Sequence, residues 1–330
     1  MKVVVIGAGA MGTACAVLLA GKGHEVTLWC RRTEHAMELA RARENRDYLP
    51  GVRIPDRVHV TARVADLAHP DVYVIAIPCV HLRAGLAPVQ DVVGACPAPT
   101  VSVIKGIEQG TFRRPTEIIE EMLGNRPLAV LSGPSHAEEF SRSLPTTVVL
   151  ACRDAALGKS LQQEFSTPRF RVYWNEDLVG VELAGALKNI IGIAAGVCDG
   201  LGFGDNAKAS LLTRGLVEIT RFGVAFGGQR ETFWGLAGLG DLITTCVSPF
   251  GRNRSVGEAL GRGESLEKIL DRMKAVPEGV WTCRAVRDLA RQHAIEMPIT
   301  DQVYQVLYEG KPPLRAVDEL MTRELKPESL

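Results

Sequence analysis

The first half of the chain alternates short apolar runs with stretches of helical spacing. Two runs, residues 3–6 and 72–77, are apolar at every position, as in strands that are covered on both faces. Strands that alternate with helices predict a parallel sheet with crossover helices. We expect one open sheet from eight strands at residues 3–6, 26–29, 58–60, 72–77, 101–104, 128–131, 147–150 and 171–174.

Beyond residue 175 the pattern changes to apolar positions three and four residues apart. Helical spacing covers residues 178–198, 206–224, 255–261, 265–273, 282–293 and 300–309. The sequence therefore predicts an α/β fold class, with an N-terminal doubly wound sheet in residues 1–178 and an all-α C-terminal domain in residues 179–330. Because no Gly/Ser-rich linker lies near residue 178, we expect the two domains to pack firmly and to share a cleft.

Three glycines directly follow the first predicted strand. Gly7, Gly9 and Gly12 form G-x-G-x-x-G between that strand and the helical run of residues 13–19. The first glycine permits the turn, the second lets backbone approach a pyrophosphate, and the third lets the helix pack on the strand. A merely tight strand-to-helix turn is the alternative. The context favours a dinucleotide site, so residues 1–178 are predicted to be a Rossmann-type dinucleotide-binding domain.

The end of the second predicted strand indicates which dinucleotide binds. Folds that bind NAD usually carry an acidic residue there for the ribose hydroxyls, whereas this chain has Cys30, Arg31 and Arg32. A guanidinium group matches the 2′-phosphate of NADPH, and no carboxylate repels it. We expect NADP(H) to be preferred and NAD(H) to be accepted as well. The alternative is a solvated helix start.

Composition narrows the classes of function. The 330 residues include 38 Lys plus Arg and 38 Asp plus Glu, which leaves no long-range positive field for nucleic acid or anionic lipid. We expect no signal peptide before the first strand and no membrane insertion, because the apolar stretches fall short of the roughly 18 residues of a span. Eight scattered cysteines without a C-x-x-C pair predict reduced thiols in the cytoplasm, with no metal site.

Polar residues follow two later strands at the sheet edge where ligands bind in open α/β folds. Lys105 comes directly after the strand at 101–104 and is a candidate substrate contact, although an ordinary loop lysine is an equally good interpretation. After the strand at 128–131, Ser135 and Glu138 have the S-x-x-E spacing of a capping box and predict a helix N-terminus.

Lys188 lies inside a predicted helix that is apolar nearly all round. Burial of an ammonium group is unfavourable unless it is paired or faces a cleft, and partial desolvation lowers the pKa of a lysine towards neutrality, which suits a general acid or base. The alternative is a lysine that snorkels to the surface. Asp241 lies in a similarly apolar segment, and Lys188 is its expected partner. The helical neighbours of Lys188 are Ala184, Gly185, Ile191 and Gly192, and all of them except Ile191 are very small.

A polar turn further along the chain predicts an anion site. Arg252, Asn253 and Arg254 precede Ser255, which has capping-box spacing with Glu258. Guanidinium donors beside a helix N-terminus suit a phosphate monoester, whereas the alternative is a solvated basic turn.

A set of short segments occurs in an order that is typical of one enzyme family. These are the glycine turn, Lys105-Gly-Ile-Glu, Ser132-Gly-Pro-Ser, Gly185-Ala-Leu-Lys-Asn, Asn206-Ala-Lys-Ala, Thr213-Arg-Gly, Gly238-Leu-Gly-Asp and Arg252-Asn-Arg. With them the chain resembles bacterial NAD(P)-dependent glycerol-3-phosphate dehydrogenase nearly from end to end. The resemblance implies a homodimer that transfers hydride reversibly between NAD(P)H and dihydroxyacetone phosphate, giving sn-glycerol 3-phosphate for glycerophospholipid synthesis.

The resemblance also implies roles for single residues. Lys188 matches the catalytic lysine, which gives a proton to the developing alkoxide, and Asp241 matches the acidic position near it. Substrate contacts fall on Lys105, Gly133, Ser135, Lys188, Asp241, Gly251, Arg252 and Asn253. Cofactor contacts fall on Gly7, Gly9, Ala10, Met11, Gly12, Arg31, Arg32, Tyr48, Lys105, Ala137, Arg252, Val276 and Glu278.

This sequence departs from the family pattern at two positions. Gly251 stands where the family usually has serine, so one hydroxyl donor to the substrate phosphate is absent and weaker substrate binding is expected. Met11 replaces a frequent bulky aromatic residue and can still pack against the cofactor.

Two other functions compete with this one. The β-hydroxyacid dehydrogenases also join a glycine turn to a helical domain with a catalytic lysine, but they carry an asparagine four residues after it, where this chain has Gly192. A silent dinucleotide sensor would keep the glycine turn but would gain nothing from Lys188, Asp241 and an anion site together.

Overall fold

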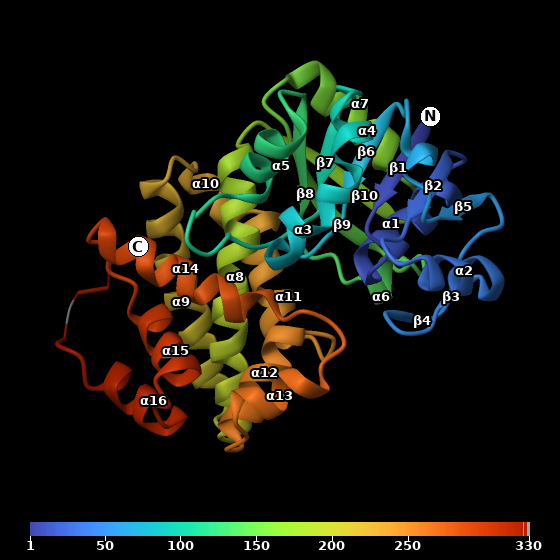
Figure 1. The fold of residues 1–330 in the computed structure, drawn as a ribbon. Coiled ribbons are helices and arrows are strands. Elements are labelled where there is room, and N and C mark those ends of the chain that lie inside the picture. The colour runs from blue at the N-terminus through green and yellow to red at the C-terminus, as the bar shows by residue number, and fades with distance from the viewer. Residues whose placement is uncertain (326, 329–330) are drawn as a thin grey trace. The chain divides into compact units, whose positions relative to one another are not determined.

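The eight apolar runs of the first half all form strands of one sheet in the computed structural model, which describes residues 1–325 and 327–328 (Figure 1). The predicted open sheet is therefore confirmed, and across it the strands stand in the order β10-β9-β8-β7-β6-β1-β2-β5. The strands are β1 (Lys2–Ile6), β2 (Glu25–Trp29), β5 (Val58–Thr61), β6 (Val72–Ile75), β7 (Thr100–Ser102), β8 (Leu128–Ser132), β9 (Thr146–Ala151) and β10 (Phe170–Asn175).

The strand order reverses beside β1. Ile6 at the end of β1 is level with Trp29 of β2 on one side and with Ile75 of β6 on the other, and both pairings are parallel. The chain builds β2 and β5 on one side and then returns to build the rest of the sheet on the other. Ligands of open α/β sheets bind outside the carboxyl ends of the strands at such a reversal, which is where the glycine turn lies.

One pairing departs from the predicted parallel sheet. β9 runs antiparallel to β8, with Val130 opposite Ala151 and Ser132 opposite Val149, and β10 is parallel to β9. The connection from β8 to β9 carries only the four-residue helix α6 (Ala137–Phe140). A parallel return would need a longer crossover, usually a full helix, so the chain turns back at the edge where β8 ends.

Helices cover both faces of the sheet, as the doubly wound prediction requires. Val3 and Val5 belong to a core cluster on one face, while Val4 and Ile6 belong to a second cluster on the other. The first cluster includes residues of α1 (Ala10–Gly21), α2 (Thr33–Ala42), α6 and α7 (Ala155–Phe165). The second includes residues of α3 (Leu82–Leu86), α4 (Gln90–Gly94) and α5 (Pro115–Leu123).

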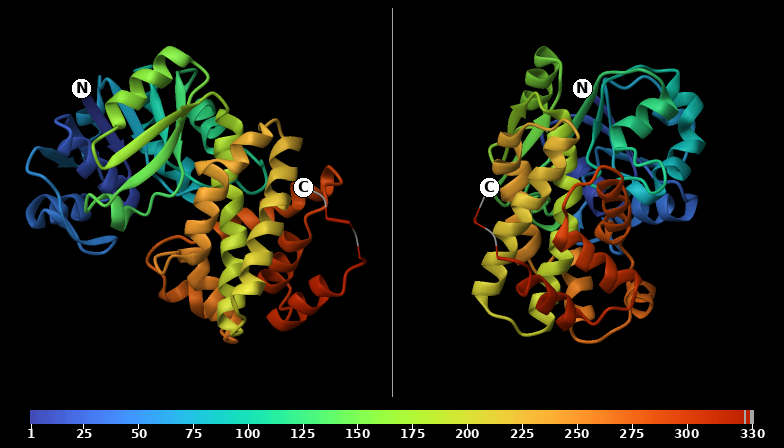
Figure 2. Two further views of the ribbon diagram at one scale, coloured as in Figure 1. Left: turned by 180° about the vertical axis from the view of Figure 1, so that it is seen from behind. Right: turned by 90° about the vertical axis from the view of Figure 1, so that its left-hand side faces the viewer.

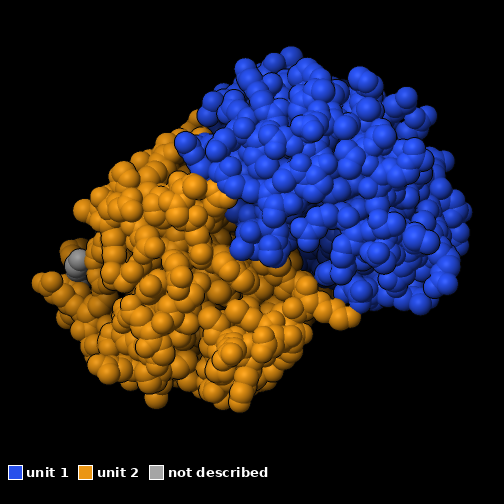
Figure 3. Space-filling model, in the orientation of Figure 1, with its two compact units in different colours: residues 1–105, 113–178 blue, residues 106–112, 179–330 orange. Residues whose placement is uncertain are grey.

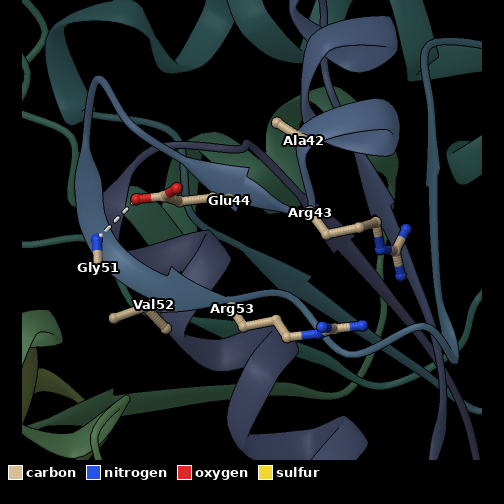
Figure 4. A pocket seen from close by; sticks show the side chains of 6 residues that line it. All are labelled: Ala42, Arg43, Glu44, Gly51, Val52 and Arg53. Carbon is tan, nitrogen blue, oxygen red and sulfur yellow. Dashed lines mark hydrogen bonds between the residues drawn. The ribbon is translucent and has the colours of Figure 1, made fainter.

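A small hairpin between α2 and β5 was not predicted. Its strands β3 (Glu44–Asn45) and β4 (Leu49–Arg53) are antiparallel and too short to show an alternating pattern. The side chain of Glu44 accepts a hydrogen bond from the backbone N–H of Gly51 (2.9 Å), which holds the pKa of Glu44 below its ordinary value (Figure 4). Six residues here line a pocket, none of them a predicted site residue: Ala42, Arg43, Glu44, Gly51, Val52 and Arg53.

The second half of the chain is helical throughout its described residues, as predicted. The pattern missed the short helices α10 and α11, and it also missed α16. The elements are α8 (Leu178–Gly200), α9 (Asp205–Ala225), α10 (Arg230–Trp234), the π-helical turn η4 (Leu236–Gly240), α11 (Asp241–Val247), α12 (Arg252–Gly261), α13 (Leu266–Arg272), α14 (Glu278–Gln292), α15 (Pro298–Tyr308) and α16 (Pro313–Met321).

Contacts divide the chain into two compact units (Figure 3). The first comprises residues 1–105 and 113–178, and the second comprises residues 106–112 and 179–330. The short segment 106–112 therefore groups with the helices, although the sequence pattern indicated a single boundary near residue 178. Within the second unit, the side chain of Gln109 donates a hydrogen bond to the carbonyl of Trp281 in α14 (3.1 Å).

Helix α8 runs lengthwise through the helical unit (Figure 1, Figure 2). It has 23 residues and is long and apolar enough to cross a membrane, so the expectation that every apolar stretch is too short was wrong. Of its most apolar window, 89% is buried inside the fold, which is typical of a core helix.

Glycines bring the backbones of α8 and α12 into contact. A Cβ atom at Gly196 would lie 1.9 Å from the carbonyl oxygen of Arg254, and one at Gly257 would lie 1.9 Å from that of Ile193. Real Cβ atoms do not approach backbone this closely, so glycine is required at both contacts. The first turn of α12 is consequently held directly against α8.

Candidate active site

The glycine turn has the geometry that its three glycines predict. Gly7 has a φ of +111°, and a Cβ atom there would lie 2.7 Å from the carbonyl oxygen of Ala76. A Cβ atom at Gly12 would lie 1.8 Å from the carbonyl oxygen of Gly7, which lets α1 pack tightly on the turn. Gly9 precedes α1 as its N-cap residue, and a Cβ atom built there meets nothing within 4 Å. The open space beside a helix N-terminus fits a dinucleotide pyrophosphate.

Arg31 and Arg32 follow β2 at the same edge of the sheet, and both are exposed. Neither guanidinium group has a hydrogen bond or ion pair to another residue in the described part of the chain. Burial and then the positive charge of Arg32 lower the pKa of His35, so this imidazole is neutral at pH 7. Tyr48, from the hairpin, lies against His35 with ring centroids 5.9 Å apart. Arg32 and Tyr48 therefore lie around one buried histidine.

Lys105 is brought together with Gly133 and Ser135. Its ammonium group donates to the carbonyl oxygen of Gly133 (3.0 Å) and to the hydroxyl of Ser135 (3.5 Å). The capping box predicted for Ser135 and Glu138 was wrong. Helix α6 begins at Ala137, and the hydroxyl of Ser135 instead donates back to the carbonyl of Gly133 (3.0 Å), because Gly133 turns sharply with a φ of +127°.

Lys188 is buried and paired in the helical unit. It is 6% exposed, and its ammonium group donates to Oδ1 of Asp241 at 2.6 Å, so the predicted pair is confirmed and the snorkelling alternative was wrong. Asp241 is itself 2% exposed. At this distance from a buried carboxylate, the charged form of the lysine is stabilised against desolvation.

Thr245 completes this arrangement and was missed by the sequence analysis. Its hydroxyl accepts a hydrogen bond from the Lys188 ammonium group at 2.5 Å. Asp241 and Thr245 stand four residues apart on α11, so they share one face of that helix. Two polar residues four positions apart in a largely apolar segment were the sequence signal that would have identified Thr245.

The residues of the predicted anion site lie at the N-terminus of α12. Gly251 is its N-cap residue, and the exposed Arg252 donates a hydrogen bond to the carbonyl of Val276 (3.3 Å), just before α14 begins at Glu278. The buried side chain of Asn253 donates to Oδ1 of Asn189 (3.0 Å) and accepts from the N–H of Gly279 (2.9 Å). These contacts connect the residue after Lys188 to the first turns of α12 and α14.

Two details of this turn differ from the prediction, and one residue of it is explained. Ser255 lies inside α12 and donates to the carbonyl of Gly251 (3.1 Å), so the second capping box was also wrong. Arg254 forms an ion pair with Asp199 (2.6 Å), so Arg252 is the guanidinium group left for an anion. A Cβ atom at Gly251 would lie 2.9 Å from the carbonyl oxygen of Thr245, which explains why glycine fits here.

Comparison with known proteins identifies the family. The model of the NAD-dependent glycerol-3-phosphate dehydrogenase N-terminus matches residues 2–158, and that of the C-terminus matches residues 177–318. The chain is 49% identical to a glycerol-3-phosphate dehydrogenase [NAD(P)+] of Chlorobium limicola, over 99% of both chains. It is 46% identical to one of Streptomyces avermitilis, over 99% of this chain and 98% of the relative.

A solved structure agrees with these relatives. The crystal structure of glycerol-3-phosphate dehydrogenase from Coxiella burnetii superposes with a TM-score of 0.93 at 39% identity, covering 98% of this chain and 99% of that one. Its likeness extends over the Rossmann-type sheet and the helices alike. The chain therefore belongs to the NAD-dependent glycerol-3-phosphate dehydrogenase family.

Proposed function

We propose that this enzyme reduces dihydroxyacetone phosphate reversibly to sn-glycerol 3-phosphate for glycerophospholipid synthesis, with NADP(H) preferred and NAD(H) also accepted. It is an NAD(P)-dependent glycerol-3-phosphate dehydrogenase, as its relatives are. The observation that carries the residue assignment is the buried ammonium group of Lys188, held by Asp241 at 2.6 Å in an apolar helix. Such a group suits proton transfer to an oxygen that becomes negative during reduction.

The first unit would hold the dinucleotide. The glycine turn fits the pyrophosphate because Gly9 leaves open space at the start of α1. When bound, the reduced nicotinamide supplies the hydride for the C2 carbonyl carbon. We assign dinucleotide contacts in this unit to Gly7, Gly9, Ala10, Met11, Gly12, Arg31, Arg32, Tyr48, Lys105 and Ala137, and in the second unit to Arg252, Val276 and Glu278.

Lys188 is the proton donor in this proposal. During reduction its ammonium group gives a proton to the C2 oxygen, and in the reverse direction the neutral amine takes that proton back. The carboxylate of Asp241 and the hydroxyl of Thr245, at 2.6 Å and 2.5 Å, fix the direction of the ammonium group. Asp241 also stabilises the charged donor before each reduction.

The substrate phosphate is assigned to the start of α12. Arg252 supplies an exposed guanidinium group at the first position of the helix, where backbone N–H groups and the helix dipole favour an anion. Gly251 and Asn253 flank it, and Lys105, Gly133 and Ser135 are assigned as substrate contacts in the first unit. Because Gly251 offers no hydroxyl, Arg252 carries a larger share of phosphate binding.

Replacing Arg252 with Ala is expected to raise the KM for dihydroxyacetone phosphate by about 10- to 100-fold, since a charge-assisted hydrogen bond contributes about 1.5–3 kcal/mol. Steady-state kinetics is measured with this substrate and with dihydroxyacetone, which lacks the phosphate. The comparison separates a loss of phosphate binding from a general loss of activity. At saturating coenzyme, which compensates for any loss of the dinucleotide contact assigned to Arg252, the activity towards dihydroxyacetone should not change. Arg262→Ala, just beyond the other end of the same helix, is the matched control. An unchanged KM in Arg252→Ala would move the phosphate site elsewhere.

The double variant Arg31→Ala/Arg32→Ala is expected to raise the KM for NADPH by about 10-fold or more and to leave the KM for NADH within about twofold, because only NADPH carries a 2′-phosphate. Arg41→Ala, at the last turn of α2, removes an exposed arginine from the same helix and should change neither value. If both coenzymes were weakened equally, the arginines would not select the phosphate.

The direct test of the function follows the absorbance of NADPH and NADH with dihydroxyacetone phosphate and, separately, with 3-keto acids. Turnover of the phosphate ketone with either coenzyme supports the proposal. Turnover of 3-keto acids alone would instead favour the β-hydroxyacid dehydrogenase alternative, and binding of the coenzymes without turnover would favour a sensor.

We also propose that the enzyme is a cytoplasmic homodimer. All eight cysteines carry thiols in the structure, and burial raises the pKa of Cys15, Cys30 and Cys246 to about 12, so they are unreactive core residues suited to a reducing compartment. Light scattering coupled to gel filtration tests the dimer, with a monomeric mass as the contrary result.

A further inference from the structure

Asn45 lies fully buried beside the glycine turn, although it comes from the unpredicted hairpin. It is 0% exposed, at the end of β3. Its side-chain N–H groups donate to the carbonyl oxygen of Ala8 (3.0 Å) and to the hydroxyl of Thr13 (2.8 Å), and its Oδ1 accepts from the N–H of Tyr48 (3.3 Å). The opposite amide orientation would face an oxygen towards the Ala8 carbonyl, so the contacts themselves fix the orientation.

The contact with Ala8 sets the direction of a backbone N–H group. The carbonyl of Ala8 and the N–H of Gly9 belong to one peptide plane, and in a trans peptide these groups point in opposite directions. Because Asn45 binds the carbonyl, the N–H of Gly9 points away from Asn45. No cis peptide bond occurs in the described chain, and Gly9 borders the open space described above.

The contact with Thr13 secures the start of the following helix. Thr13 is 0% exposed, and its N–H donates to the carbonyl oxygen of Gly9 (2.9 Å), which is the first hydrogen bond of α1. Asn45 therefore holds both ends of the segment from Ala8 to Thr13 with one amide group. That segment contains the helix N–H groups that have no partner inside the helix.

The hairpin that carries Asn45 is anchored at several points. Glu44 closes it through the N–H of Gly51 (2.9 Å), and the side chain of Arg142, which follows α6, donates to the carbonyl of Pro50 (2.9 Å). The carbonyl of Arg43 accepts from the N–H of Ile54 (2.7 Å). Asn45 is thus presented to the glycine turn from a fixed frame.

We propose that Asn45 is a positioning residue for dinucleotide binding: it orients the Gly9 N–H and the start of α1 towards the pyrophosphate and fixes Tyr48 through its backbone. This inference rests on the proposed placement of the dinucleotide at the glycine turn. Asn45 does not contact the reacting atoms. Its loss therefore weakens coenzyme binding and leaves proton transfer by Lys188 intact.

Two substitutions of Asn45 separate the loss of its hydrogen bonds from the effect of a negative charge at the same place. Asn45→Ala removes all three hydrogen bonds and is expected to raise the Kd of NADPH by about 10-fold. Asn45→Asp keeps the shape but places a carboxylate oxygen against the Ala8 carbonyl and a negative charge near the pyrophosphate, so the increase should reach about 100-fold. Thr13→Val, which removes one contact, should show a smaller increase.

The test measures the Kd of NADPH by fluorescence and the kinetic constants of the intact enzyme for each variant. At saturating NADPH, kcat and the KM for dihydroxyacetone phosphate should stay within about twofold of wild type. The matched control is Tyr73→Phe, which removes a buried hydrogen bond to the carbonyl of Leu67 (2.8 Å) from the same unit without touching the turn.

The outcomes distinguish a failure of this inference from a failure of the proposed dinucleotide site. An unchanged Kd in both Asn45→Ala and Thr13→Val would overturn the positioning role, and so would an equal increase in Tyr73→Phe, since general loosening would then explain the effect. If Asn45→Asp fails to fold, the Kd values of Asn45→Ala and Thr13→Val test the positioning role. If Gly9→Val binds NADPH normally, the placement of the dinucleotide is wrong, whatever Asn45 does.

Discussion

The variant Lys188→Ala is expected to lower kcat by about 10² to 10⁴, which is the usual loss when a general acid is removed. The Kd of NADPH should remain near the wild-type value, because the lysine is assigned to proton transfer and not to the dinucleotide. Stopped assays with saturating substrate measure the residual kcat, and fluorescence titration measures coenzyme binding. A near-normal kcat would leave Lys188 a purely structural role.

Because Lys188 and Asp241 form a buried ion pair, Lys188→Ala is also expected to be less stable. Removing one partner of a buried pair leaves the other charge uncompensated and destabilises a protein by about 3–5 kcal/mol. The double variant Lys188→Met/Asp241→Asn removes both charges and should fold better than Lys188→Ala while remaining inactive. Lys311→Met is the matched control, because Lys311 is also largely buried and paired, with Glu319, but lies outside the proposed site. It should keep the wild-type kcat.

The variant Gly9→Val should lose most of its affinity for both NADPH and NADH. Gly9 has a φ of −79° and a ψ of −172°, a conformation that valine adopts readily, and its Cβ atom would meet nothing within 4 Å. Folding is therefore preserved, while the new side chain fills the space assigned to the pyrophosphate. If the new side chain prevents two charge-assisted hydrogen bonds from backbone N–H groups to the pyrophosphate, at about 1.5–3 kcal/mol each, Kd rises by at least about 10²-fold.

A control at the other end of the same helix tests this interpretation. A Cβ atom at Gly21, the last residue of α1, also meets nothing within 4 Å. Gly21→Val should therefore match Gly9→Val in Tm but bind both coenzymes normally. Normal binding by Gly9→Val would contradict the assignment of the glycine turn, and a large fall in its Tm would mean that the residue acts through stability.

Hydrophobic patterning predicted the inner strands of the large sheet because they are short, nearly continuous apolar runs covered on both faces. The edge strands β5 and β10 showed instead as apolar positions that alternate with exposed ones. The patterning failed for β3, which has only two residues, and for β4, whose pattern is interrupted by Pro50 and Gly51. The reversed direction of β9 was also invisible, since burial determines that a segment is a strand but not which way it runs. That direction depends on the short connection through α6.

For the site, the sequence predicted the pair of Lys188 and Asp241 because two buried charges must compensate each other. Thr245 and Asn45 were not found, since neutral polar residues are common and their partners lie far away in the sequence. Both capping boxes failed for a related reason. Ser135 and Ser255 have the right spacing, but nearby glycines set the local backbone, and each serine hydroxyl turns back to a carbonyl two or four residues earlier.

The glycine contacts between α8 and α12 bear on how the enzyme recognises the length of its substrate. Lys188 lies on α8 and Arg252 begins α12, and the two backbones touch at Gly196 and Gly257. No side chain lies between the helices at these points that repacking could use to change their spacing. If the ammonium group contacts the ketone oxygen and the guanidinium group contacts the phosphate, the fixed spacing of the two helices favours a phosphate ester of three carbons. A longer substrate would then have to be accommodated by the side chains, such as that of the exposed Arg252, because the spacing of the two helices is fixed.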